Sequence, residues 1–225
     1  HSNELDHEGN IWVPSVKYPH SFERLSEFRD DAIAKISPSG DVLFTKSVAE
    51  ILVENGYQVL LSTGMDDDPI HINDIQPALS DSNFWRKGDL LLSLRKPSTV
   101  LLYRPSTNKV LWLKTGPWMN QHDMNFVDDH TISVFGNDVI DNTGTIRLFN
   151  GHNSVYFYDF KTNEVTEPYR DIMKEAGVKT LTEGLATPLS GGDLFIIAMT
   201  NVVALLHIII LIVLKFMKKI NLILL

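Results

Sequence analysis

The sequence contains no cysteine among its 225 residues. This absence excludes disulfide bonds, zinc sites built from thiolates and cysteine nucleophiles. Basic residues are also few, with 20 Lys and Arg against 28 Asp and Glu, which gives a net charge of −8. Because nucleic-acid-binding proteins carry an excess of positive charge, this balance argues against a nucleic-acid partner. A small anion can still bind where arginine, histidine or backbone donors gather.

Long apolar runs are absent until the C-terminal end of the chain. Val202–Leu214 is apolar except for His207, and a lysine-containing segment follows it. The run is shorter than the roughly 20 residues that a membrane-spanning helix needs. Three interpretations stay open: a membrane anchor or contact through 202–214, a buried strand or helix, and an aberrant tail, since the composition changes abruptly after Asn201.

Short β-type segments separated by turn residues fill most of the remaining chain. Residues 90–95, 100–103 and 109–114 read as three consecutive strands, and 31–36 with 41–46 form another pair. Ser47 begins a short helix that ends at Gly56, and a second helix runs from Pro168 to Gly177. Short strands at this spacing are typical of an all-β sandwich, barrel or propeller.

Three segments that begin alike favour the propeller. They start at His1, His71 and Gln121–His122, and each leads through a polar turn into a β-rich run. The interval between the second and third starts matches the roughly 40–50 residues of a four-stranded blade. A fourth start, without histidine, lies at Thr182–Gly184. Equivalent positions of successive repeats superimpose, so the three histidines are expected to converge.

We therefore predict an all-β fold in two parts. Residues 1–200 form an incomplete β-propeller of about three to four blades, with short helical insertions. Residues 201–225 form an apolar C-terminal segment. The chain starts at His1 without a methionine or a signal-like stretch, and His1 lies inside the first repeat. These features predict that the chain is a fragment of a longer protein.

An ordered set of motifs resembles the arylsulfotransferase (arylsulfate sulfotransferase) family of six-bladed propellers. The set consists of His71–Ile75, Ser93–Arg95, Leu111–Leu113, Gln121–Asp123 and Phe135–Asp138, in that order. The similarity covers roughly residues 1–200. One departure is Gly136, which stands where the family usually has Asp.

The resemblance implies an enzyme that moves a sulfuryl group from an aryl sulfate ester to a phenol, without a nucleotide or other cofactor. His122 resembles the histidine that takes the sulfuryl group, and His71 and Arg95 resemble the residues that bind the sulfate. His1 and Asn73 are assigned to substrate binding, and no metal is assigned. The resemblance also favours an exported, periplasmic or membrane-associated location.

The residue types suit this chemistry. A neutral imidazole is a competent nucleophile near neutral pH, because its reference pKa is about 6.5. The planar guanidinium of Arg95 matches two sulfate oxygens, and His71 and His1 can donate to developing negative charge. A phenol with a pKa of about 10 is a good leaving group.

Other interpretations stay open beside the catalytic one. The chain could be a non-catalytic propeller that acts as a binding or interaction module, with His122 in a local hydrogen bond beside Asp123 and Arg95 in a surface ion pair. Three histidines also allow a zinc site, although no His-x-His or His-x-x-x-His spacing is present. Asp66–Asp68 could bind calcium or form a solvated loop. The oligomeric state and the physiological donor and acceptor are not encoded in any motif.

Overall fold

The structure is a computed structural model that describes residues 3–23, 27–62, 67–141, 145–189, 191–200 and 208–214. It divides into two compact units, His1–Pro117 (unit 1) and Trp118–Leu225 (unit 2), and each is treated by itself. The predicted boundary near residue 200 stays a prediction, because 201–207 and 215–225 lie outside the described residues.

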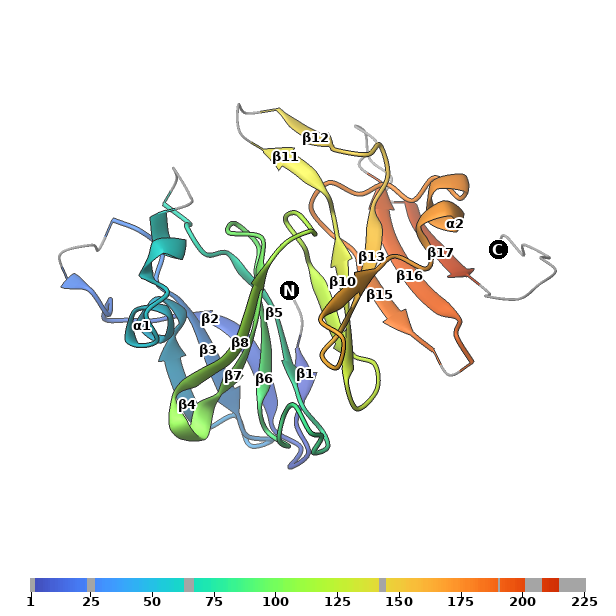
Figure 1. Ribbon diagram of the computed structural model, residues 1–225. Coiled ribbons are helices and arrows are strands. Elements are labelled where there is room, and N and C mark those ends of the chain that lie inside the picture. The colour runs from blue at the N-terminus through green and yellow to red at the C-terminus, as the bar shows by residue number, and fades with distance from the viewer. Residues whose placement is uncertain are drawn as a thin grey trace. The chain divides into compact units, whose positions relative to one another are not determined.

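Unit 1 contains two four-stranded antiparallel sheets (Figure 1). The first comprises β1 (Glu4–Leu5), β2 (Ile11–Val16), β3 (Asp31–Ile36) and β4 (Val42–Ser47). The second comprises β5 (Ile72–Pro77), β6 (Leu90–Leu94), β7 (Thr99–Arg104) and β8 (Lys109–Thr115). In both sheets neighbouring strands are consecutive in sequence, which is the up-and-down order of a propeller blade.

A short helix joins the two sheets of unit 1. Helix α1 (Val48–Glu54) begins where Ser47 Oγ accepts a hydrogen bond from the Glu50 N–H at 3.1 Å. This bond satisfies one of the backbone donors that the first turn leaves unpaired. Gly56, with a φ of 83°, allows the chain to leave the helix. The short 3-10 helices η2 (Gln58–Ser62) and η3 (Pro105–Thr107) complete the unit.

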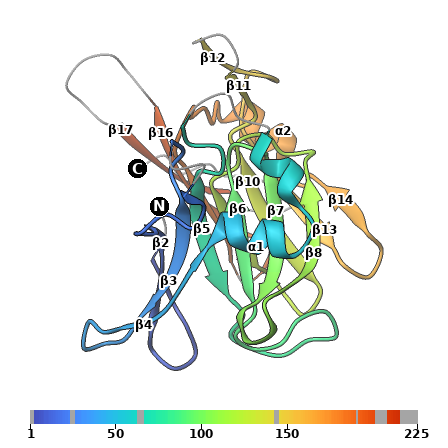
Figure 2. The same cartoon turned by 90° about the vertical axis from the view of Figure 1, so that its left-hand side faces the viewer.

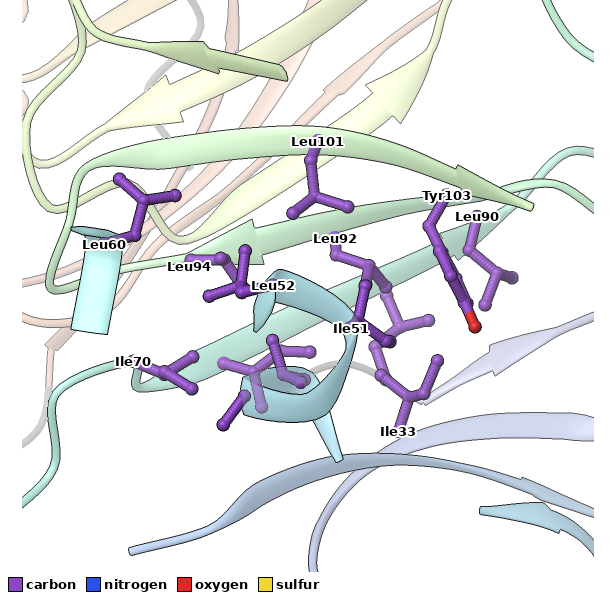
Figure 3. Close-up of a cluster of buried hydrophobic side chains, with 14 of the residues drawn as sticks. Ile33, Ile51, Leu52, Leu60, Ile70, Leu90, Leu92, Leu94, Leu101 and Tyr103 are labelled. Atoms are coloured by element: carbon purple, nitrogen blue, oxygen red, sulfur yellow. The ribbon is translucent and has the colours of Figure 1, made fainter. Parts of the chain in front are cut away.

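The core of unit 1 lies between α1 and the two sheets (Figures 2 and 3). Ile51 and Leu52 of α1 point toward Leu92 and Leu94 of β6, and Ile33 contributes from β3. All five side chains are fully buried. Full burial of one such side chain contributes about 1.5–3 kcal/mol, so this helix is held by packing rather than by its own propensity.

Unit 2 contains a third four-stranded sheet in the same order. Its strands are β9 (Asp123–Phe126), β10 (Thr131–Gly136), β13 (Ser154–Asp159) and β14 (Glu164–Thr166). A hairpin of β11 (Val139–Asp141) and β12 (Ile146–Leu148) is inserted between the second and third strands. The prediction of an all-β, propeller-like chain with short helical insertions is confirmed.

A three-stranded sheet ends the described part of unit 2. It contains β15 (Leu185–Pro188), β16 (Leu194–Thr200) and β17 (Ile208–Leu214), and it packs with helix α2 (Arg170–Glu175) around a core that includes Phe135 and Met173. The predicted fourth repeat start, Thr182–Gly184, directly precedes β15.

The apolar C-terminal run is only partly described. Residues 208–214 form β17, which pairs with β16 along its whole length. The rest of the predicted membrane segment, 202–207, lies outside the described residues. In the part of the chain that the structure describes, no helix is long and apolar enough to cross a membrane.

Candidate active site

Two of the predicted site histidines occupy the same position in their sheets. His71 directly precedes β5, and His122 directly precedes β9, each the first strand of a four-stranded sheet. Antiparallel pairing brings each histidine close to the residue that follows the second strand of its sheet. That residue is Arg95 after β6 and Asn137 after β10. His1 lies outside the described residues.

The imidazole of His122 is held in one tautomer by Asn137. His122 is 8% exposed, and its backbone N–H donates to the Phe135 carbonyl at 3.1 Å. Its ring Nδ1 lies 2.5 Å from Asn137 Oδ1. An amide oxygen can only accept, so Nδ1 carries the proton. The lone pair of the neutral ring is therefore on Nε2.

The orientation of the Asn137 amide follows from its other contacts. Its Nδ2 donates to the carbonyls of Thr180 at 3.3 Å and Glu183 at 2.9 Å. Because both of these groups are acceptors, the NH₂ must face them and the oxygen must face His122. The side chain is fully buried, so turning it over would leave polar atoms without suitable partners.

Asn153 supports the loop that orients Asn137. Its Nδ2 donates to the carbonyls of Asn137 and Thr180, both at 2.8 Å, and its Oδ1 accepts from the Thr180 N–H at 2.7 Å. Asn153 therefore holds the same loop through the Asn137 carbonyl and the Thr180 backbone.

Asp123, the neighbour of His122, connects two strands of unit 2. Asp123 Oδ2 accepts from the Ala186 N–H at 2.9 Å and from Asn125 Nδ2 at 3.0 Å, which ties β9 to β15. Asn137 was visible in the sequence only as part of Phe135–Asp138. The signal that could have identified it is its place directly after the second strand of the blade.

A buried carboxyl lies beside Asn137. Asp138 Oδ1 accepts from the Met119 N–H at 3.0 Å, and Tyr156 donates its hydroxyl to Oδ2 at 2.9 Å. Burial raises the pKa of Asp138 to about 6 and also raises the pKa of Tyr156. A Cβ on Gly136 would lie 2.5 Å from Asp138 Oδ1, which explains why this sequence has glycine there.

In unit 1 the structure brings His71 and Arg95 together. The Arg95 N–H donates to the His71 carbonyl at 3.1 Å, because the start of β5 pairs with the end of β6. Arg95 is only 5% exposed, so it is not the surface residue of the alternative interpretation. Asn73, two residues after His71, is buried at the β-bulge between Ile72 and Asp74.

Asp68 orients the His71 ring. Its Oδ1 accepts from the His71 N–H at 3.1 Å, and its Oδ2 lies 2.5 Å from Nδ1. Burial acts to raise the pKa of Asp68, but the hydrogen bond and charge of His71 and the charge of Arg29 outweigh it, and the pKa is lowered. An ionised carboxylate only accepts, so the Nδ1 of His71 carries a proton.

Arg29 and Asp31 complete this acid–base network. Arg29 Nε lies 2.8 Å from Asp31 Oδ1, and its Nη1 lies 3.7 Å from Asp68 Oδ2. Asp31 Oδ2 accepts from the Ile72 N–H at 2.8 Å, which attaches β3 to the start of β5. Burial raises the pKa of Asp31 to about 6. The sequence carried no motif for this network. Asp67 and Asp68, the described residues of the suggested calcium loop, contact Arg29 and His71.

Among the described residues, one group has its possible ligand atoms close enough together to bind one cation. Asp128, Asp129 and His130 lie together in the exposed turn between β9 and β10. None of the predicted site residues belongs to this group, and acidic side chains gather in exposed turns without binding a metal.

Comparisons with known proteins agree with this architecture. The family model described as "Arylsulfotransferase (ASST)" matches residues 1–203. No curated protein matches the chain. One solved structure, a protein of unknown function from Bacteroides caccae, is similar at 17% identity with a TM-score of 0.53. The match covers 88% of this chain and 56% of that one, so this chain spans little more than half of the other's length. At this identity the likeness concerns the fold alone.

Proposed function

This chain belongs to the arylsulfotransferase family, and on that basis we propose that it transfers a sulfuryl group from an aryl sulfate ester to a phenolic acceptor. His122 is the residue that takes the sulfuryl group, and no nucleotide is needed. The observation that carries the proposal is the buried bond between His122 Nδ1 and Asn137 Oδ1, which leaves the lone pair on Nε2.

The reaction proceeds in two displacements. Nε2 attacks sulfur, the bond from sulfur to the phenolic oxygen breaks, and the phenolate leaves with the electron pair. The acceptor phenol then attacks the sulfur of the sulfo-histidine, the N–S bond breaks, and the proton of the phenol passes to a base or to water. Throughout, Asn137 accepts from Nδ1–H and stabilises the positive charge that the ring gains on sulfation.

The proposal assigns the sulfate oxygens to Arg95 and His71. Arg95 offers a planar fork of donors, and burial strengthens their attraction for an anion. His71 is oriented by Asp68, and the proposal assigns its ring to the leaving oxygen. Asn73 and His1 remain proposed substrate-binding residues.

The test is release of nitrophenol from p-nitrophenyl sulfate in the presence of phenol. His122→Ala should abolish release, whereas His130→Ala, in the exposed β9–β10 turn of the same unit, should not. Arg95→Lys keeps the charge but loses the fork, so it should mainly raise KM. Full activity of His122→Ala would reject the assignment.

A second measurement separates catalysis from mere binding. After incubation with donor alone, the peptide containing His122 should gain the mass of one SO₃ group, and phenol should remove it. Saturable binding of the aryl sulfate with no labelled histidine would favour a non-catalytic binding module.

A further inference from the structure

A cavity lies in unit 1, at the opposite end of the strands from His71 and Arg95. It has a volume of about 610 Å³, within the range of small-molecule sites. Its walls come from the start of β2, the end of β3 and the start of β4 in one sheet. The other sheet contributes the loop before β6 and the segment after β7. No histidine lines it, so it is separate from the residues of the proposed sulfuryl transfer.

One wall of the cavity is apolar and aromatic. The rings of Trp12 and Phe44 meet edge to face, with centroids 5.6 Å apart. Trp12 is nearly buried, which makes this wall rigid, and Leu43 beside it is 54% exposed. A flat ligand ring could remove Leu43 and the edge of Phe44 from water, which favours binding.

Two cations of the lining, Lys35 and Arg104, are already paired with carboxylates. Lys35 Nζ lies 2.8 Å from Asp6 Oδ2 and 2.7 Å from Glu8 Oε2. Arg104 forms a bidentate ion pair with Asp89: its Nε donates to Oδ1 at 2.7 Å and its Nη2 donates to Oδ2 at 2.6 Å. Because Lys35 faces two carboxylates and Arg104 faces one, these groups leave no excess positive charge.

The lining also includes two cations of a different kind. Arg86 and Lys87 are exposed, and neither side chain forms an ion pair with any residue that the structure describes. Their backbone is nevertheless held in place: the Arg86 N–H donates to Asp89 Oδ2 and the Lys87 N–H to Asp81 Oδ1, both at 2.8 Å. Arg86 and Lys87 are therefore the cations of the lining that can pair with an anionic ligand, and they lie in the same lining as the aromatic wall.

We propose that this cavity binds a small aromatic anion, a flat ring bearing one sulfonate, sulfate or carboxylate group. The ring packs against Phe44 and Leu43, and the anionic group pairs with Arg86 and Lys87; Ser106 and Thr107 belong to the same lining. A cationic ligand is disfavoured by the same two side chains. The site binds without reacting, so its occupancy does not depend on sulfuryl transfer.

The test uses 1-naphthalenesulfonate, whose C–S bond prevents it from acting as a sulfuryl donor. Titration calorimetry on the full chain should show saturable binding that weakens with salt. The double variant Arg86→Glu/Lys87→Glu should weaken binding by at least about tenfold, because two exposed attractions become repulsions. Lys109→Glu, an exposed charge change on β8, and His122→Ala should leave binding unchanged.

A second measurement covers the case in which the double variant does not fold. In the unmodified chain, naphthyl protons should show NMR contacts to the ring of Phe44 and the methyl groups of Leu43. Absence of binding, equal binding by a folded double variant, or loss of binding in His122→Ala would each overturn the proposal. The last outcome would place the ligand at the proposed catalytic histidine instead.

Discussion

Asn137→Ala offers the sharpest test of how His122 is prepared for its proposed role. In the native chain, the Nδ1–H tautomer makes a buried hydrogen bond to Asn137 Oδ1, and the Nε2–H tautomer would set two lone pairs against each other. A net buried hydrogen bond is worth about 0.5–1.5 kcal/mol, and leaving a buried acceptor unsatisfied costs a further 1–3 kcal/mol or so. Together these exceed the 1.4 kcal/mol or so that gives a tenfold preference, so at least about nine-tenths of the neutral ring should be Nδ1–H.

The assay is ¹⁵N NMR of the ring of His122, which distinguishes the protonated from the unprotonated nitrogen. The native chain should show a protonated Nδ1 and an unprotonated Nε2 at a pH where the ring is neutral. In Asn137→Ala this preference should fall, and the two nitrogen shifts should move toward each other. If sulfuryl transfer is present, its rate should fall in parallel, because a smaller fraction of rings presents the lone pair on Nε2.

Asn153→Ala is the matched control. It removes side-chain bonds to the same Thr180 segment, so it should cost a similar 1–3 kcal/mol or so of stability. It leaves the Asn137 oxygen facing His122, so the tautomer should be retained. An unchanged ring in Asn137→Ala, or a native ring protonated on Nε2, would refute the reasoning.

Three further predictions concern stability and orientation. Burial raises the pKa of Asp138 to about 6, above the roughly 3.9 of an unfolded chain, so its contribution to stability is full below about pH 4 and is lost as the pH rises through about 6. The unfolding free energy of the native chain relative to Asp138→Asn, from urea titrations, should therefore fall by about 2–3 kcal/mol between pH 4 and 7; a pH-independent difference would contradict this. Gly184→Ala would place a Cβ 2.2 Å from Phe135 at a φ of +147°, so thermal unfolding should show a loss of about 3 kcal/mol or more. Gly177→Ala, with open space and a φ of +65°, should lose only about 1–2 kcal/mol, and equal losses would be inconsistent with the clash. Asp68→Asn weakens the bond that orients His71, so kcat/KM for p-nitrophenyl sulfate should fall about tenfold or more; an unchanged value would mean that this orientation is not needed.

Local patterns in the sequence determined the elements of this fold. The strands β6, β7 and β8, the helix that starts after Ser47 and the breaks at Gly56 and Gly177 were all predictable. Each depends on propensities, caps and turn residues within a few positions of the chain. The spacing of the repeat starts likewise predicted that His71 and His122 would each precede the first strand of a sheet.

The tertiary structure alone decided what surrounds these histidines. Asn137 is 15 positions from His122, and its own amide is oriented by carbonyls of Thr180 and Glu183, which belong to a later loop. No periodicity encodes such bonds, because they depend on which strand ends meet and on which polar groups are left to be satisfied there.

The same contrast holds in unit 1. The sequence determined that His71 begins a strand and that Arg95 ends another, but the antiparallel register of β5 and β6 decided that the two lie side by side. The sequence also did not reveal that Arg29 and Asp31 complete the network around Asp68. Strand formation is a local property of the chain, whereas burial and the pairing of polar side chains are settled only when distant segments pack together.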